Sequence, residues 1–365
     1  MQYWKLSFII MTLSGCWASA FGQSTLNPDI SVIPRFRIDT DDGSNLPHER
    51  SFRNPRFSLE EFELALQAYL NPYARADIFI AKPGFEDEPV EIEEAYATFL
   101  RGLPLDMNIR LGKYLVEFGK LNMLHPHAWP FLSKPLSLER FMGEEGINDL
   151  GLSASFLIPT GDLYTRLTVD ILQGLSIANG PGMESPDEER VSYANAARLM
   201  SFFPVDTNSD LEIGLSGLTG IHDPLAELRF HYVNLDFKYK WKPDAYTSFV
   251  LQGEGLLNRR RVSSGVEPSS EVITTSGFYV FGDYQFRKIF TLGARYDWAQ
   301  SPYDKDDKAS GFAIFFGFYP VEETTAFRLQ YQNTLFNTPD GGSRSVNSIA
   351  LQFIFSMGPH KAHPF

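Results

Sequence analysis

The chain has 365 residues, and its 45 acidic and 32 basic side chains give a net charge of −13 at pH 7. This acidity argues against nucleic acid as a partner, because affinity for a phosphate backbone depends on clustered lysine and arginine. After the first twenty residues, no stretch approaches the roughly 18 consecutive apolar residues that a membrane-spanning helix needs, although 14% of the chain is aromatic.

Residues 1–20 differ in character from the rest of the chain. Lys5 is their only charge, an apolar run follows it, and small residues end the segment, which predicts a secretory signal peptide. Ala18-Ser19-Ala20 fits ordinary signal cleavage, whereas the residues up to Cys16 fit a lipobox in which that cysteine would be lipidated. We favour cleavage after Ala20, since a barrel needs no lipid anchor, and this leaves residues 21–365 without a thiol.

From Ile30 onward, segments of about ten residues alternate apolar with polar side chains, and turn-forming residues separate them. This period of two is typical of strands with two different faces. We predict sixteen strands, at about 30–40, 56–70, 73–82, 90–101, 107–116, 149–158, 163–173, 191–203, 210–219, 227–241, 245–257, 275–287, 290–299, 310–319, 324–335 and 346–357.

The connections between these strands sort by parity. Those after even-numbered strands are short and turn-like, whereas those after odd-numbered strands are mostly long and polar. Outer-membrane barrels have this arrangement, with tight periplasmic turns, longer extracellular loops and both termini on the periplasmic side. The sequence therefore predicts an all-β fold, a transmembrane antiparallel β-barrel in the outer membrane of a Gram-negative bacterium.

The two strand faces fit this prediction. Phe327, Leu329 and Tyr331 would meet lipid, while Arg328 and Gln330 point inward, because a charge on the lipid face costs about 2–4 kcal/mol at the midplane. Sixteen strands leave an aqueous channel unless something plugs it. We expect the lumen to be lined by Glu94, Tyr96, Arg110, Arg166, Asp170, Arg295 and Arg328.

The longest connection, residues 117–148, is the third long loop, and it carries apolar side chains such as Trp129 and Phe131 that a solvated loop would not need. One hypothesis is that it folds into the lumen as a constriction. The alternative is that it packs over the barrel mouth or mediates a subunit contact. The candidate charges at the constriction are Lys120, Lys134, Glu139, Arg140, Glu144 and Glu145.

Within this loop, His125 and His127 are candidate metal ligands, since neutral imidazole suits zinc, copper or nickel. Two histidines need at least one further ligand, and the alternative is that they only support the loop structure. No Gly-x-Ser-x-Gly, His-Glu-x-x-His or phosphate-binding glycine motif occurs, and His231 is the only histidine placed within a predicted strand. We therefore expect neither an enzyme nor a cofactor.

Three acidic segments, 86–88, 187–189 and 304–307, lie in predicted loops. They would either bind the divalent cations that bridge lipopolysaccharide or simply be solvated. The chain ends at Phe365, which is similar to the terminal signal read by the barrel-assembly machinery.

Two motifs carry a family resemblance. Val90–Phe99 (VEIEEAYATF) has a Glu-Ala-Tyr core, and Ile109–Asn122 (IRLGKYLVEFGKLN) has an Arg-x-Gly strand that enters the long third loop. Together with the strand order and chain length, they resemble the porin O/P group of outer-membrane porins, which includes phosphate-selective members. The resemblance implies passive, selective diffusion through a trimeric pore.

Our prediction is a porin-like channel for small polar or charged solutes, with outer-membrane lipid and lipopolysaccharide around it. A ligand- or metal-binding receptor with a loop-closed pore is the alternative, and zinc bound at His125 and His127 would favour it. A third possibility is a structural barrel that does not conduct.

Overall fold

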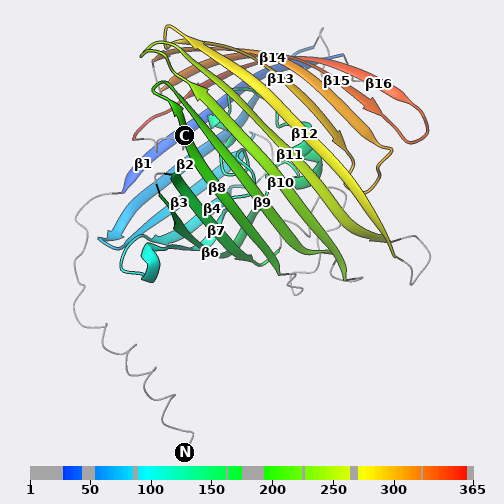
Figure 1. Cartoon of the computed structure of the whole chain (residues 1–365). Helices are drawn as coiled ribbons and strands as arrows, with labels where there is room; N and C mark the ends of the chain where they lie inside the picture. Colours follow the sequence, from blue (N-terminus) through cyan, green and yellow to red (C-terminus); the bar gives the residue numbers. More distant parts are fainter. Residues whose placement is uncertain are drawn as a thin grey trace, which may run out of the picture.

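The computed structural model describes residues 28–42, 54–84, 89–161, 163–174, 193–223, 227–263, 270–321 and 324–359. In this part of the chain, sixteen antiparallel strands form a closed barrel in which each strand pairs with the next and β16 pairs with β1 (Figure 1). The predicted sixteen-stranded antiparallel barrel is therefore confirmed. The predicted signal peptide, Cys16, the acidic segments 86–88 and 187–189 and Phe365 lie outside the described residues.

The strands are β1 (Asp29–Asp41), β2 (Arg56–Asn71), β3 (Ala74–Pro83), β4 (Glu91–Phe99), β5 (Asn108–Leu115), β6 (Asn148–Thr160), β7 (Leu163–Leu172), β8 (Ala194–Asp206), β9 (Ser209–Asp223), β10 (Leu228–Trp241), β11 (Ser248–Ser263), β12 (Ser270–Phe286), β13 (Phe290–Gln300), β14 (Lys308–Val321), β15 (Thr325–Asn337) and β16 (Ser343–Phe355). Three short helices join them: η1 (Pro104–Asp106), η2 (Pro126–Ala128) and α2 (Leu136–Met142). Among the residues described, no helix is long and apolar enough to cross a membrane.

Several strands run further toward the long-loop end than the sequence predicted. Strand β9 reaches Asp223 and β11 reaches Ser263, because ladder pairing with β10 and β12 continues beyond the last clear alternation of apolar and polar residues. His222 consequently lies on β9, so the prediction that only His231 lies on a strand was wrong. Backbone hydrogen bonding between strands, rather than the alternation of side chains, therefore determines where β9 and β11 end.

The outer face of the barrel is apolar. Along β15, Phe327, Leu329 and Tyr331 are exposed, whereas Arg328 and Gln330 are buried inside. Near the short-turn end, a row of stacked aromatic rings crosses six strands, from Phe286 and Phe290 through Phe318, Phe327 and Phe353 to Phe36. An apolar band edged by aromatic residues is how outer-membrane barrels face lipid.

Candidate functional site

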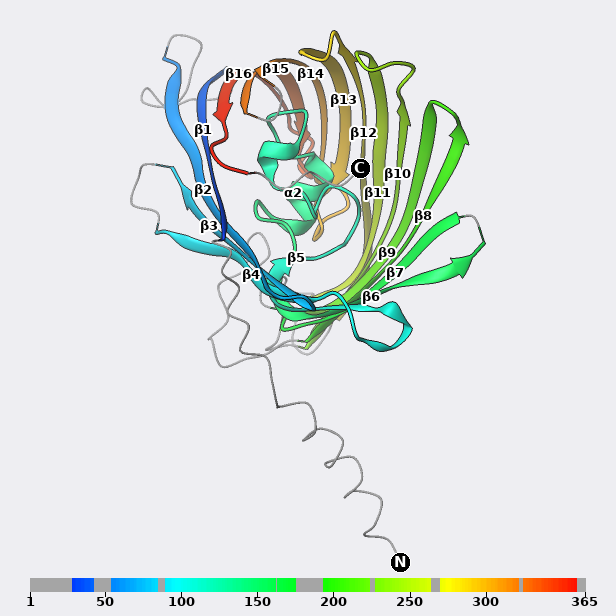
Figure 2. The ribbon, with the colours of Figure 1, turned by 90° about the vertical axis from the view of Figure 1, so that its left-hand side faces the viewer.

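The connection between β5 and β6 lies inside the barrel. We call residues 116–147 the inner loop; they carry η2 and α2, and Figure 2 shows α2 and the turns around it within the ring of strands. Helix α2 packs against β12, β13 and β14. Proline and glycine interrupt this segment, so it cannot join the sheet, and its apolar side chains are covered only by the barrel wall.

Polar contacts fix the first part of the inner loop. The Lys120 ammonium lies 2.6 Å from Glu212 Oε2, and the backbone N–H of Leu121 donates to Glu254 Oε1 at 2.8 Å. Gly119 has φ of +68°, and a Cβ there would lie 2.0 Å from Glu254 Oε2, so only glycine fits. Its N–H donates to Ser216 Oγ at 3.1 Å. Because these groups are buried, each hydrogen bond offsets a desolvation cost.

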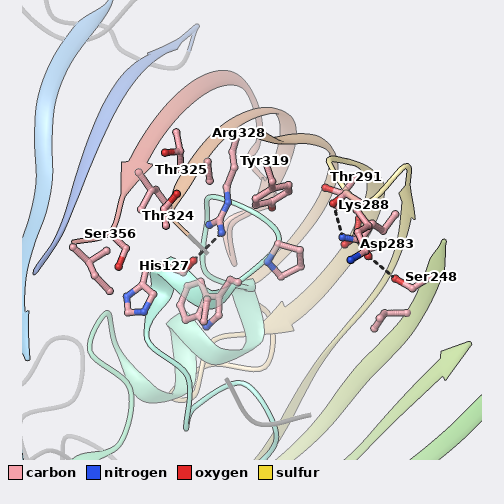
Figure 3. Close-up of a pocket in the computed structure, with 18 of the residues that line it drawn as sticks. His127, Ser248, Asp283, Lys288, Thr291, Tyr319, Thr324, Thr325, Arg328 and Ser356 are labelled. Carbon is pink, nitrogen blue, oxygen red and sulfur yellow. Dashed lines mark hydrogen bonds between the residues drawn. The ribbon is translucent and has the colours of Figure 1, made fainter. Parts of the chain in front are cut away.

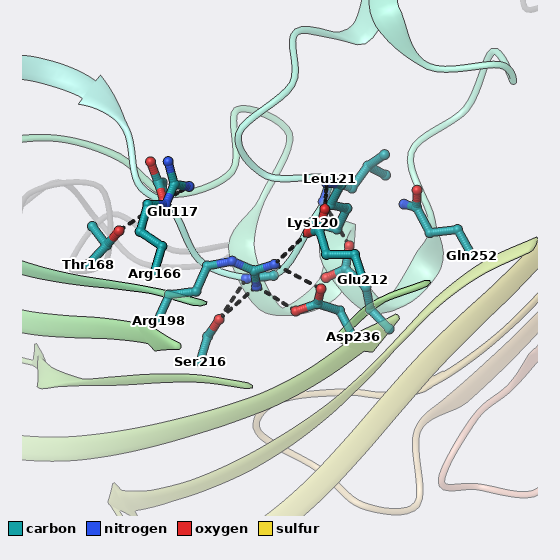
Figure 4. Close-up of polar contacts among 12 residues, drawn as sticks. Glu117, Lys120, Leu121, Arg166, Thr168, Arg198, Glu212, Ser216, Asp236 and Gln252 are labelled. Atoms are coloured by element: carbon teal, nitrogen blue, oxygen red, sulfur yellow. Dashed lines mark hydrogen bonds and ion pairs between the residues drawn. The ribbon is translucent and has the colours of Figure 1, made fainter. Parts of the chain in front are cut away.

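The wall beneath this part carries a buried charge network (Figure 4). The Arg198 guanidinium, 2% exposed, donates to both oxygens of Asp236, at 2.5 and 2.9 Å, and lies 3.5 Å from Glu212. Sequence reasoning missed Arg198, Glu212, Asp236 and Glu254. The available signal was a charged residue at an inward position on each of four consecutive strands, β8 to β11.

Aromatic contacts fix the second part of the inner loop to the next stretch of wall, formed by β12 and β14. The Phe131 ring meets Phe281 and Phe315 edge-on, with centroids 5.2 and 5.8 Å apart. Arg295 lies over the same ring at 4.2 Å and donates to the Ser133 carbonyl oxygen at 2.6 Å. Such aromatic pairs add about 0.5–1.5 kcal/mol beyond their buried area. These two sets of contacts therefore hold the inner loop along one continuous arc of wall, from β9 to β14.

The predicted pore-lining residues all lie on the inner side of the wall, in different environments. Glu94 accepts the Leu115 N–H at 2.9 Å, Asp170 accepts the Tyr114 hydroxyl at 3.0 Å, and Arg295 is occupied by Asp297 and Ser133. Tyr96, Arg110 and Arg166 instead line an open chamber of about 250 Å³ near the short-turn end. Arg328 faces a larger cavity, described below.

The charged residues predicted to form the constriction also lie in different environments. Lys120 is buried in its ion pair, and Arg140 lies 3.1 Å from Asp307 in the β13–β14 connection. Lys134 donates to the carbonyl oxygens of Gly143 and Glu144, at 2.8 and 2.9 Å. Burial lowers the pKa of Lys134 to about 8 and raises the pKa of Glu139 on α2. The side chains exposed here are Glu139, Glu144 and Glu145.

The two histidines lie against the wall formed by β2 and β4. His125 Nε2 is 2.8 Å from Glu94 Oε1, and its Nδ1 is 3.4 Å from Glu63 and 3.3 Å from Glu93. Burial alone would lower the pKa of His125, but these carboxylates raise it well above its usual value. Burial lowers the pKa of His127, whose Nδ1 lies 3.2 Å from Glu63.

A cavity of about 490 Å³ opens below the inner loop at the short-turn end (Figure 3), and we call it the vestibule. The inner-loop residues 127–130 form one side of it. Arg328 donates from Nη2 to the His127 carbonyl oxygen at 2.8 Å, and its Nε and Nη1 have no hydrogen-bond partner. The other charged side chains that line the vestibule are Lys240, Lys242, Lys288 and Asp283.

A second cavity, of about 570 Å³, lies at the long-loop end. It is lined by Leu136, Glu139 and Arg140 of α2 and by residues 301–303 and 307 of the β13–β14 connection. The inner loop thus contributes to the walls of cavities at both ends of the barrel. This is the arrangement expected of a segment that narrows a passage.

Comparison with known proteins shows the fold. No family model matches the chain. An uncharacterized protein of Aquifex aeolicus is 28% identical over 395 aligned residues, covering 95% of this chain and 82% of that protein. Among solved structures, the outer membrane channel DcaP of Acinetobacter baumannii has a TM-score of 0.58 and 14% identity, covering 92% of this chain and 99% of its own.

An anion-selective porin from Comamonas acidovorans has a TM-score of 0.59 and 9% identity, covering 90% of this chain and 99% of its own. OmpT, an outer membrane protein of Vibrio cholerae, has a TM-score of 0.54 and 8% identity, covering 90% of this chain and 97% of its own. These similarities show that the chain has the fold of these outer-membrane porins, and its apolar outer band is of the kind that faces lipid in such barrels.

Proposed function

We propose that this protein is a porin-like channel for the passive diffusion of small polar or charged solutes, without enzymatic activity, and that the inner loop sets its bore. The observation that carries the proposal is the position of the inner loop inside the barrel, where Lys120 anchors it to β9, Phe131 to β12, and His125 contacts β4 across the lumen. Sixteen strands enclose an aqueous space too wide for side chains alone to fill, so a loop across it determines what passes.

We further propose that the passage favours small anions. Of the described residues that line the vestibule, four are basic, Lys240, Lys242, Lys288 and Arg328, and one is acidic, Asp283. Local charge at a narrow place governs ion preference more than the net charge of the chain does. The similar Comamonas acidovorans protein is an anion-selective porin, and the resemblance to the porin O/P group points the same way.

The test is the reversal potential of the purified mature protein in planar bilayers under an asymmetric KCl gradient. The proposal predicts steady channels that prefer chloride, and a loss of that preference in Arg328→Gln. Arg259→Gln, at an exposed position on β11, is the matched control and should leave the reversal potential unchanged. Cation preference in the unmodified protein would refute the anion proposal, and no conductance from a demonstrably folded barrel would refute the channel.

We infer that the functional unit is a homotrimer inserted by the barrel-assembly machinery, with lipid and lipopolysaccharide around its outer face. OmpT of Vibrio cholerae has been solved in a trimer form, and the same fold is present here. Chemical cross-linking in native membranes should give a three-chain product, and a pattern that stops at one chain would contradict this inference.

A further inference from the structure

Four metal-binding side chains meet where the inner loop touches the wall. They are His125 and His127 of the inner loop, Glu63 of β2 and Glu93 of β4. One ligand atom from each of Glu63, Glu93 and His125 lies within 4.8 Å of the others. Residues from three separate segments of the chain therefore converge on one point.

A β-bulge helps to make this convergence possible. In the β3–β4 ladder, Phe79 pairs with Glu94 but Ile80 pairs with Ile92, so Glu93 is an extra residue without a partner. In a regular strand, Glu93 and Glu94 would face opposite sides of the sheet. Bulges redirect side chains in this way and are common beside functional sites. Here, both carboxylates reach His125.

Several atoms at this point lack the hydrogen bonds that burial normally demands. Glu63 is only 1% exposed, yet neither of its carboxylate oxygens has a hydrogen-bond partner, and the same holds for Glu93 Oε2 and His125 Nδ1. Buried carboxylates without donors are costly, and each calls for an explanation such as a bound ion.

Glu94 prepares His125 to act as a ligand. Its Oε1 lies 2.8 Å from His125 Nε2, and once a metal ion displaces the Nδ1 proton, it would accept the remaining ring N–H while Nδ1 faces Glu63 and Glu93. Metal-binding histidines usually have such a carboxylate on the second nitrogen, which fixes the tautomer and raises the basicity of the ligand atom.

The spacing of the ligand atoms matches a small divalent ion. His125 Nδ1 is 3.3 Å from Glu93 Oε2 and 3.4 Å from Glu63 Oε2, which is itself 3.2 Å from His127 Nδ1. Tetrahedral coordination at the bond lengths of zinc places neighbouring ligand atoms about 3.3 Å apart. We propose that Glu63, Glu93 and His125 bind a divalent first-row transition metal ion, with zinc as the best fit, and that His127, 3.2 Å from Glu63, lies beside the site.

Such an ion would act as a third anchor for the inner loop. The polar contacts of Lys120 reach β9, and the aromatic contacts of Phe131 reach β12 and β14, whereas the proposed site ties η2 to β2 and β4. Three attachments around the circumference would fix the height and tilt of the inner loop. The site does not depend on the channel proposal, because a barrel of any function could bind the ion.

The experiment uses the full mature protein, refolded in detergent, stripped with a chelator and titrated with zinc chloride by calorimetry. We expect one zinc ion per chain. His125→Ala and Glu93→Gln should each weaken the affinity at least about 100-fold, and Glu94→Gln about 10- to 100-fold, through the neighbouring hydrogen bond. Cobalt in place of zinc should give the intense visible absorption of a tetrahedral site.

His231→Ala is the matched control, because this histidine is exposed on β10 and bonds only Thr219 among the described contacts. It should bind zinc as the unmodified protein does. A difference in gel mobility between heated and unheated samples (heat modifiability) shows whether each variant is folded. The proposal is overturned if the folded, stripped protein binds no zinc, which would leave His125 as a protonated partner of its carboxylates. Stoichiometric binding that persists in both His125→Ala and Glu93→Gln would also overturn it.

Discussion

The two parts of the inner loop are attached in different ways. Residues 116–122 depend on buried hydrogen bonds and one ion pair, with Lys120 and Leu121 bound to acidic side chains of β9 and β11. Residues 129–142 add aromatic packing, with Phe131 between Phe281 and Phe315, to hydrogen bonds such as those that Ser133 accepts from Arg295. Polar attachment is directional and fails when one partner is lost, whereas apolar attachment weakens in proportion to the area removed.

The largest effect should come from Glu254→Ala. Glu254 accepts hydrogen bonds from the Leu121 N–H, the Asn234 amide and the Tyr279 hydroxyl, all buried. Each donor left without a partner costs about 1–3 kcal/mol. We expect rapid proteolysis within residues 116–125 of the folded barrel, measured by mass spectrometry of the fragments. Glu254→Gln keeps one acceptor oxygen, so protease should cleave its inner loop more slowly. Equal cleavage rates for the two variants would contradict the idea that these hydrogen bonds hold the loop.

The next effect is that of Phe131→Ala, which removes the central ring of the apolar attachment. Truncating a buried phenylalanine costs about 3–5 kcal/mol. We expect the second part of the inner loop to move from the wall and the single-channel conductance to become larger and noisier. Phe131→Leu fills most of the space, so its conductance should lie between that of the unmodified protein and that of Phe131→Ala. Such a graded response distinguishes packing from hydrogen bonding. An unchanged conductance in Phe131→Ala would argue against the role of Phe131 in holding the inner loop on the wall.

A smaller effect is expected for Lys120→Met. Breaking a buried ion pair by removing one partner costs about 3–5 kcal/mol of stability. Arg198 lies 3.5 Å from Glu212 and still compensates the charge of that carboxylate, so we expect a loss near the lower end of this range. The double variant Lys120→Met with Glu212→Gln should recover most of the loss in a double-mutant cycle read by protease resistance. Additive losses would mean that the two side chains are not coupled.

The smallest effect concerns pH. Burial lowers the pKa of Lys134 to about 8, below its value in an unfolded chain. The cost of burying its charge is therefore present in full below about pH 8 and is relieved as pH rises from there toward the unfolded value. Between about pH 7 and about pH 9 the lumen loses this charge. Glu139, Glu144 and Glu145 face it, so the reversal potential should shift toward cations. Lys134→Met should remove the part of this shift that comes from Lys134. A shift of the same size in Lys134→Met and in the unmodified protein would contradict the prediction.

The wall of the barrel could be predicted from the sequence, because alternation is local. Leu292 and Tyr296 face lipid and Arg295 faces inward, as the period of two implies. The largest differences from the prediction lie where strand pairing continues beyond the side-chain alternation, at the ends of β9 and β11 and at the start of β12. A second kind of difference arises at bulges, where a skipped residue such as Glu93 changes face. A bulge depends on how two strands pair, so one strand alone does not reveal it.

The candidate site was harder to predict. The apolar residues of the inner loop indicated that it needs a surface, and His125 and His127 suggested a metal. The sequence did not show that Glu63 lies beside them or that Lys120 is buried against Glu212, since these contacts join residues that are distant in the chain. Charge type alone therefore could not separate residues that face solvent from residues that form internal pairs.

The central claim is that the inner loop narrows a conducting passage, and single-channel conductance tests it most directly. The measurement compares the mature protein with a variant in which residues 125–142 are replaced by a short glycine-serine linker, both shown to be folded. The account predicts steady channels for the mature protein and a several-fold larger conductance for the variant. Equal conductance from the two folded barrels would contradict it.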